Sequence, residues 1–181
     1  NSSATGTVTG NASVGGLIGE NLGAVIDSST AGTVTGSEDV GGLVGYNTGQ
    51  VAESSATGSV NGDSSVGGLV GYNFGGRVTN SSATGTINGS GVVGGLVGEN
   101  HGTVTNSSAT GSVTGNQGVG GLVGYNAGGR VTNSSATGSV NGSEDVGGLV
   151  GFNANEVTEG TVTNSSATGT VTGNASVGGL I

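Results

Sequence analysis

The feature that most constrains the fold is a tandem repeat. The block Val-Gly-Gly-Leu-(Val/Ile) recurs with steps of 26, 26, 27, 26, 27 and 31 residues, its first valine being Val14, Val40, Val66, Val93, Val119, Val146 and Val177. A second block, usually Asn-Ser-Ser-Ala-Thr-Gly, keeps the same steps from Asn1, Asp27, Glu53, Asn80, Asn106, Asn133 and Asn164. A unit this short cannot bury an apolar face alone, so neighbouring units must stack into one continuous core.

The composition of each unit selects strands over helices. Helical repeats need about 33–47 residues of good helix formers, whereas this chain holds 44 Gly and no Pro, and Ser, Thr and Val fill its units. One unit contains three short extended pieces, around 104–105, 112–114 and 121–124, divided by turn residues. We therefore predict an all-β parallel β-solenoid with about 26–27 residues and three short strands per coil. Residues 1–181 would form one continuous segment of about six and a half coils.

An asparagine row predicts the register of the coils. It lies seven residues after each repeat valine, at Asn21, Asn47, Asn73, Asn100, Asn126 and Asn153. An inward Asn ladder at a corner would satisfy turn backbone groups coil by coil. All length variation follows this row, so the longest insert, residues 154–161, is predicted to be a protruding loop. Because segments 1–18 and 164–181 are identical, we also expect a longer array with a higher-order period.

In the Gly-Leu-Val-Gly strand, the sequence must indicate which aliphatic residue points into the core, because simple alternation places the two on opposite sides of the strand. Glutamates two residues further on, Glu20 and Glu99, suggest that the Val/Ile parity is outward and that the leucines fill the core. The alternative is a bulge that turns both inward. An outward apolar stripe would be a contact surface; its members would be Ile18, Val44, Tyr46, Val70, Tyr72, Val97, Val123, Tyr125, Val150 and Phe152.

The net charge and the hydropathy of the chain limit which kinds of binding partner we expect. The formal net charge is −9, with only Arg77 and Arg130 as basic residues, so nucleic acid is not expected as a partner. No apolar run approaches the roughly 18–20 residues that cross a bilayer, and the chain is not expected to span a membrane. His101 is the only histidine and no cysteine is present. Without a second acid–base partner at a recognisable spacing, we expect no enzyme activity and no cofactor.

The sequence contains candidate residues for calcium binding and for N-linked glycosylation. Calcium, which prefers oxygen ligands, has weak candidates in the acidic turns before the repeat valine: these are Glu38, Asp39, Asp63, Glu144 and Asp145. The simpler interpretation is a solvated acidic turn. Asn-Ser-Ser sequons permit glycosylation in an extracellular setting, with Asn80, Asn106, Asn133 and Asn164 as acceptors.

Two alternative functions compete with a structural role. Val8 and its equivalents should point inward, leaving outer rows such as Thr7 and Thr9 whose spacing resembles the hydroxyl arrays of ice-binding solenoids. Ser and Asn interrupt those rows, and Thr suits exposed strand positions in any case. A carbohydrate-active β-helix is a lower alternative, because it needs clustered carboxylates in a groove.

The block VGGLVGYN and its variants resemble the GLUG repeat, named for Gly-Leu-any-Gly. The motif recurs at 16–19, 42–45, 68–71, 95–98, 121–124 and 148–151. Similar repeats occur in large bacterial surface and adhesin-like proteins and beside immunoglobulin-A-cleaving metallopeptidases. No His-Glu-x-x-His zinc motif is present, so peptidase activity does not carry over. The resemblance implies an extracellular or cell-surface structural or adhesive rod, stalk or filament that associates with itself or with another surface protein or glycan.

Overall fold

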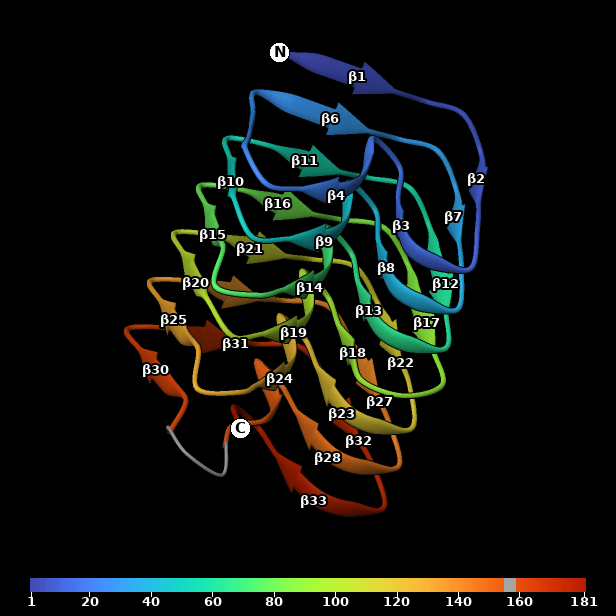
Figure 1. Ribbon diagram of the computed structural model, residues 1–181. Coiled ribbons are helices and arrows are strands. Elements are labelled where there is room, and N and C mark those ends of the chain that lie inside the picture. Colours follow the sequence, from blue (N-terminus) through green and yellow to red (C-terminus); the bar gives the residue numbers. More distant parts are fainter. Residues whose placement is uncertain (155–158) are drawn as a thin grey trace.

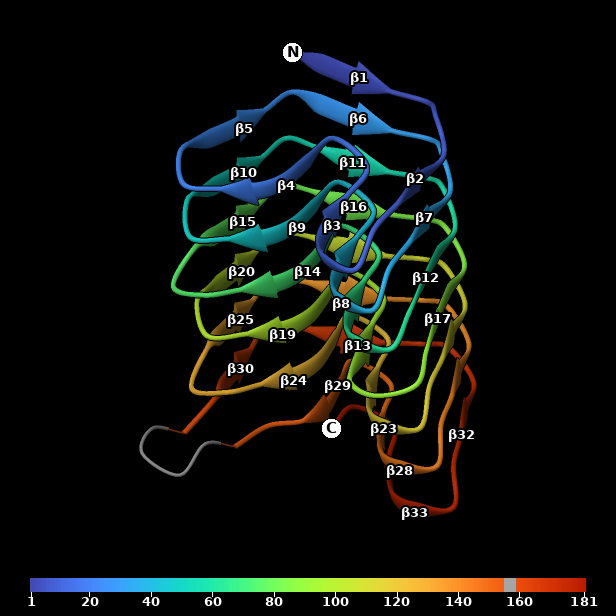
Figure 2. The ribbon, with the colours of Figure 1, turned by 45° about the vertical axis from the view of Figure 1, so that its right-hand side comes forward.

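The computed structural model describes residues 1–154 and 159–181, and it is a parallel β-solenoid (Figure 1). Coils of about 26 residues stack so that each strand pairs in parallel with its counterpart one coil later, as Val51 pairs with Val25 and Val78. No helix occurs in the described residues. The predicted fold class is confirmed. Figure 2 shows the successive coils stacked on one another from the N-terminal to the C-terminal end.

Five parallel sheets run along the solenoid, here lettered A to E in the order in which the chain visits them. Sheet A consists of β1 (Ser2–Ala4), β6 (Ser28–Thr30), β11 (Ser55–Ala56), β16 (Ser82–Ala83), β21 (Ser108–Ala109), β26 (Ser135–Ala136) and β31 (Ser166–Ala167). Sheet B consists of β2 (Val8–Thr9), β7 (Val34–Thr35), β12 (Val60–Gly62), β17 (Ile87–Gly89), β22 (Val113–Thr114), β27 (Val140–Asn141) and β32 (Val171–Thr172).

The other three sheets complete each coil. Sheet C consists of β3 (Ala12–Gly15), β8 (Glu38–Gly41), β13 (Ser64–Gly67), β18 (Val93–Gly94), β23 (Gln117–Gly120), β28 (Glu144–Gly147) and β33 (Ala175–Gly178). Sheet D consists of β4 (Ile18–Asn21), β9 (Val44–Asn47), β14 (Val70–Asn73), β19 (Val97–Asn100), β24 (Val123–Asn126) and β29 (Val150–Phe152). Sheet E consists of β5 (Ala24–Ile26), β10 (Gln50–Ala52), β15 (Arg77–Thr79), β20 (Thr103–Thr105), β25 (Arg130–Thr132) and β30 (Thr161–Thr163).

The three extended pieces predicted for one coil are all present, as β20, β22 and β24. The structure adds two short strands between them, β21 and β23. These two strands were hard to see in the sequence because all their residues except Val119 are Ser, Ala, Gln or Gly, which carry little strand preference. Their pairing comes from the stacking itself, which places equivalent backbone next to equivalent backbone.

The core is divided into two hydrophobic columns. One lies between sheets A, D and E and contains residues such as Ala56, Leu69 and Val78. The other lies between sheets B and C and is built almost entirely from two valine rows, represented by Val60 and Val66. Each column runs through every coil, so burial in one coil depends on the coil above and the coil below.

Of the two facings left open for the Val/Ile row of sheet D, the outward one is wrong and the alternative, in which both aliphatic residues turn inward, is confirmed. Val44, Val70, Val97, Val123 and Val150 are fully buried, and Ile18 packs partly buried against the same column. The leucine row is buried from Leu43 onward, as predicted, and Leu17 in the first coil is partly buried, so both aliphatic residues point inward. The cause is a corner at this point: the backbone N–H groups of Leu69 and Val70 both donate to the carbonyl of Leu96, at 2.8 and 3.0 Å. Two successive residues share one acceptor, and the alternation of facing is broken.

The two glycines of the Gly-Leu-Val-Gly motif are required by close backbone approach. A Cβ at Gly68 would overlap the carbonyl oxygen of Gly95 in the next coil. A Cβ at Gly71 would overlap the backbone between Asp39 and Val40, where sheet D presses against sheet C. The motif therefore encodes a corner whose apolar pair points inward and whose flanking glycines let backbone pack on backbone.

The predicted asparagine ladder is confirmed. Each side chain donates from Nδ2 to Oδ1 of the next, with distances of 2.7 Å from Asn21 to Asn47 and 2.8 Å at every later step to Asn153. A second ladder, not predicted, is made by serine. The Ser54 backbone N–H donates to the Ser81 hydroxyl, and that hydroxyl donates to the Thr79 carbonyl. Both ladders satisfy polar groups at corners that the solenoid buries.

From the second Asn-Ser-Ser-type block onward, the first residue of each block has a left-handed backbone. Asn80 has φ 50°, and Glu53 holds the same conformation with φ 52°. Asn tolerates this region better than Glu because its short side chain bonds locally. We therefore expect Glu53→Asn to stabilise the chain by about 0.5–1 kcal/mol, a part of the left-handed penalty. Thermal unfolding measures the change. Glu53→Gln is the matched control, and equal stabilisation by Gln would assign the effect to charge instead.

Half of the predicted protruding loop, residues 155–158 of 154–161, lies outside the described residues, and its last residue, Thr161, begins β30. On its two sides the coil is regular: Asn126 donates to Asn153, and Asn153 donates to the carbonyl of Gly160 at 3.0 Å. The insert is therefore placed between sheet D and sheet E, where the sequence located all variation in coil length.

Candidate recognition surface

The outward side of sheet D carries the largest group of aromatic side chains. One row follows the buried valines by two residues and pairs in register from coil to coil, as Tyr46 does with Tyr72 and Tyr72 with Glu99. Tyr46, Tyr72 and Tyr125 are half-buried and Phe152 is 43% exposed. The aromatic half of the predicted stripe thus faces out, while its aliphatic half lies in the core.

A second column lies one residue beyond the asparagine ladder and contributes Phe74 and His101. Phe74, 52% exposed, packs on Tyr46 and Tyr72 with ring centroids 6.3 and 5.9 Å apart. The His101 ring contacts the Tyr72 ring edge-on, with centroids 5.3 Å apart. The Tyr46 ring also contacts the Tyr72 ring edge-on, with centroids 5.4 Å apart. Four rings from three coils therefore form one continuous surface, which we call the aromatic cluster: Tyr46, Tyr72, Phe74 and His101.

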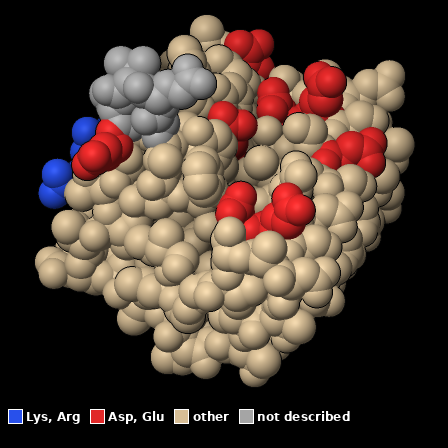
Figure 3. All heavy atoms as spheres, turned by 90° about the horizontal axis from the view of Figure 1, so that it is seen from below, with Lys and Arg blue, Asp and Glu red and all other residues tan. Residues whose placement is uncertain are grey.

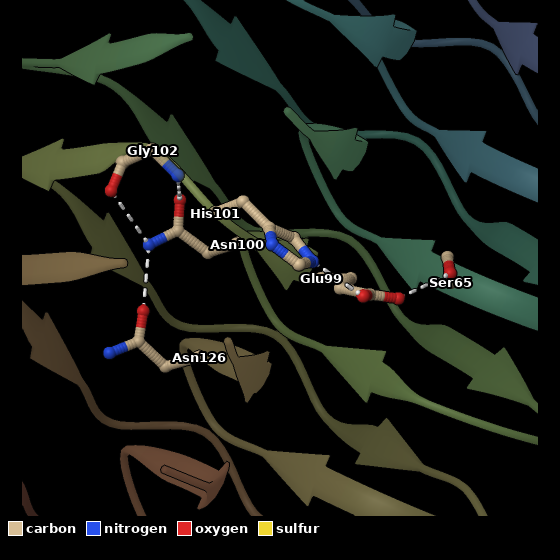
Figure 4. A network of polar contacts seen from close by, with 6 residues as sticks. All are labelled: Ser65, Glu99, Asn100, His101, Gly102 and Asn126. Atoms are coloured by element: carbon tan, nitrogen blue, oxygen red, sulfur yellow. Dashed lines mark hydrogen bonds and ion pairs between the residues drawn. The ribbon is translucent and has the colours of Figure 1, made fainter. Parts of the chain in front are cut away.

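A carboxylate is fixed beside the aromatic cluster (Figure 4). Glu99 Oε1 lies 2.8 Å from His101 Nε2, and the Ser65 hydroxyl donates to Glu99 Oε2 at 3.4 Å. Figure 4 also shows the Asn100 side chain pointing away from Glu99, into the ladder with Asn126. Adjacent residues of one strand thus serve opposite purposes, since Asn100 holds the coils together and Glu99 faces outward.

The electrostatic environment around Glu99 is negative. Burial raises the pKa of Asp39, and the nearby charges of Glu99 and Glu38 raise it further. Burial, followed by Glu99, Tyr46 and Asp39, raises the pKa of Tyr72 to about 12. Sheet C thus brings Asp39 to the same surface as Tyr72 and Glu99. We call Asp39, Glu99 and the aromatic cluster together the aromatic–acidic face.

The raised pKa of Asp39 predicts a pH-dependent cost. The pKa of Asp39 in the folded state lies above the ordinary 3.8 of the unfolded state. The free energy of unfolding therefore falls as the pH rises from 3.8 through the folded-state pKa, and it stays lower at higher pH. Asp39→Asn should therefore raise the melting temperature at pH 7 and lose this advantage below pH about 3.8. The gain should stay below about 1 kcal/mol because the group is partly exposed. Asp145→Asn, where φ is 52° against 49° at Asp39, controls for the backbone. An equal gain at both pH values would contradict the prediction.

The calcium candidates do not converge in the structure. Glu38, Asp63 and Glu144 are exposed, whereas Asp39 and Asp145 are half-buried in different coils. Within residues 1–154 and 159–181, no group of three His, Asp or Glu side chains could hold a metal ion. Figure 3, a view onto the C-terminal end, shows acidic side chains in separate groups and the basic ones at one edge.

The remaining candidates are spread over other sheets. The sequon residues Asn80, Asn106, Asn133 and Asn164 are exposed, each with the left-handed backbone of its corner. Arg77 and Arg130 are exposed on sheet E, both in register with Thr103 between them. On sheet B the outer row reads Thr35, Asn61, Asn88 and Thr114 in register, so the hydroxyl array is interrupted as the sequence indicated.

Sequence reasoning missed Phe74 and His101 as partners of the tyrosines. Their column holds Leu22, Thr48, Phe74, His101 and Ala127, which share no chemical type. The signal that could have found them is their position, one residue after a ladder asparagine and two residues after the aromatic row. Both lie at the corner that follows sheet D.

Fold and surface define the class: a repeat β-solenoid whose stacked coils carry an exposed aromatic–acidic face. The chain matches the family described as the GLUG motif in five consecutive segments, residues 36–61, 62–88, 89–114, 115–141 and 142–172. It belongs to this family of repeats, as the resemblance implied. No curated protein and no solved structure matches the chain. In the described residues, no helix is long and apolar enough to cross a membrane.

Proposed function

We propose that this segment is a non-catalytic, extracellular structural repeat that forms a stiff rod and adheres to another surface. The observation that carries the proposal is the contrast between the uniform stacking chemistry inside and the aromatic–acidic face outside. The ladders and valine columns repeat in coil after coil, whereas Tyr46, Tyr72, Phe74 and His101 gather in three neighbouring coils.

Exposed rings on a rigid sheet favour adhesion for a physical reason. Tyr and Phe supply large contact areas with few rotatable bonds, so ordering them on binding costs little. The packed cluster is already held by ring–ring contacts and by the strands beneath it. Several such segments on one rod would convert weak contacts into avidity. GLUG membership supports the same role through the repeat architecture.

Bead adhesion tests the proposal. Beads coated with the chain should be retained on a panel of intact cells and extracellular-matrix films under flow, whereas beads coated with the Tyr46→Thr, Phe74→Thr variant should wash off. Threonine keeps a strand-compatible β-branched residue at Tyr46, which lies in β9, and Phe74 lies in the corner after β14, outside the strand. The variant must melt like the parent for the comparison to count. Equal retention of both coatings, or retention of neither, would refute an adhesive role for this face.

Localisation needs its own measurement. Antibodies against the segment should label intact cells of the source organism without permeabilisation. Labelling that appears only after permeabilisation would contradict the extracellular assignment.

The rod shape is tested by electron microscopy. Images of the native protein should show a straight, thin rod, and a compact particle would contradict the structural role.

A further inference from the structure

The aromatic–acidic face carries the negative charges of Asp39 and Glu99, and neither arginine of the chain pairs with them in the described residues. The backbone of Asp39 lies against Gly71, next to Tyr72, and Glu99 pairs in register with Tyr72 one coil later. Two carboxylates therefore lie on either side of Tyr72, and their negative charges repel each other. Among the described residues, the only ion pair at this face joins Glu99 to His101, and the imidazole carries its charge only when it is protonated. The two arginines lie on sheet E, whereas Asp39 and Glu99 lie on sheets C and D. A bound cation would relieve this repulsion, whereas a neutral ligand would leave it in place.

The surroundings of the carboxylates further restrict the ligand. A metal ion needs several converging ligands, and no such group of three exists in the part of the chain that the structure describes. The rings instead offer flat apolar faces and edges over about the width of three coils. A planar organic cation can stack on such rings while its N–H groups reach a carboxylate.

We propose that the aromatic–acidic face binds an arginine side chain displayed by a partner protein. The guanidinium stacks against the aromatic cluster and donates to Glu99. Within the described part of the chain, each Glu99 oxygen accepts a single contact, one from His101 and one from Ser65, which leaves further acceptor sites. Asp39 adds attraction from the adjoining sheet C. Arginine fits better than lysine because its fork is planar and weakly hydrated. This inference rests on the proposed adhesive function and specifies the chemistry of the partner.

A short peptide tests the charge and the shape of the ligand. The probes are blocked peptides of four arginines, four lysines and four citrullines, the last being the uncharged isostere of arginine. Titration calorimetry in about 0.15 M salt, where long-range attraction is largely screened, should rank arginine first. We expect arginine to bind at least about tenfold more tightly than citrulline and about threefold more tightly than lysine.

Matched variants separate a site from general acidity. Glu99→Gln should weaken arginine binding at least about fivefold, the loss of a charge-assisted hydrogen bond. Asp145→Asn removes the same charge from the equivalent of Asp39 in a later coil, and it should change the affinity less than about twofold. Tyr46→Leu, which keeps an apolar side chain but removes the ring, should weaken arginine more than lysine. Each variant is first checked for unchanged melting.

Several results would overturn the inference. Equal losses from Glu99→Gln and Asp145→Asn would show that net charge alone attracts the peptide. Equal affinity for arginine and citrulline would show that the face recognises something other than a cation. Self-association of the chain that Tyr46→Leu abolishes would make a second copy the occupant instead. Beads that adhere through this face while the arginine peptide does not bind would leave the adhesive role intact and remove only the cationic partner.

Discussion

Leu69→Asp is expected to unfold the coils around it at neutral pH. Leu69 is fully buried in the column between sheets A, D and E, and its neighbours along that column are Leu43 and Leu96. The change removes a leucine and leaves an unpaired carboxylate in the core. The two effects together should cost more than about 4 kcal/mol.

The loss should be local at first, because each coil contacts mainly its neighbours. Amide hydrogen exchange should accelerate most in β9, β14 and β19 and least in the terminal coils. Leu69→Met is the control, since it keeps the volume and should cost less than about 1.5 kcal/mol. A Leu69→Asp protein with the melting temperature of the parent would show that this leucine does not face the core.

Asn73→Ala should be the most damaging of the polar substitutions. Asn73 is fully buried, donates to Asn100 Oδ1 and to the Gly76 carbonyl, and accepts from Asn47 Nδ2. Alanine leaves three partners short of a hydrogen bond and opens a small cavity. The expected cost is about 3–5 kcal/mol, from roughly 1–3 kcal/mol for each unsatisfied buried group.

Asn88→Ala is the matched control for this prediction. Asn88 also bonds an asparagine one coil away, donating to Asn61 Oδ1 at 3.0 Å, but that pair is exposed. Water replaces the lost partner there, so the cost should be below about 0.5 kcal/mol. Chemical denaturation of both variants measures the difference. Similar losses for Asn73 and Asn88 would mean that the ladder is not the structural element that burial suggests.

The fold could be predicted because the register of its coils follows from residue identity. Equivalent residues stack on one another, so rows such as Asn47, Asn73 and Asn100 can be recognised from their spacing in the sequence. The inward direction of Val70 could not be recognised in that way. Alternation assumes a continuous strand, and the shared acceptor at Leu96 that breaks it arises only when the next coil is in place.

The candidate surface was predicted in part for a related reason. The tyrosines form a row in one strand and could be found by their spacing. Phe74 and His101 belong to a column of mixed residues, and Asp39 reaches the face from a different sheet. Their meeting depends on the corner after the asparagine ladder and on the close packing of sheets C and D, which the sequence does not display.

Disulfide trapping tests most directly the in-register stacking on which both the fold and the aromatic–acidic face depend. The chain contains no cysteine, so introduced pairs report without background. Asn61 and Asn88 are paired in adjacent strands, and Asn88 pairs in turn with Thr114. Adjacent strands lie about 4.8 Å apart, within the range of about 4.4–6.8 Å that a disulfide spans. Asn61→Cys with Asn88→Cys should therefore oxidise fully within the monomer, whereas Asn61→Cys with Thr114→Cys, two coils apart, should keep both thiols free. Ready oxidation of the second pair and free thiols in the first would contradict the stacking.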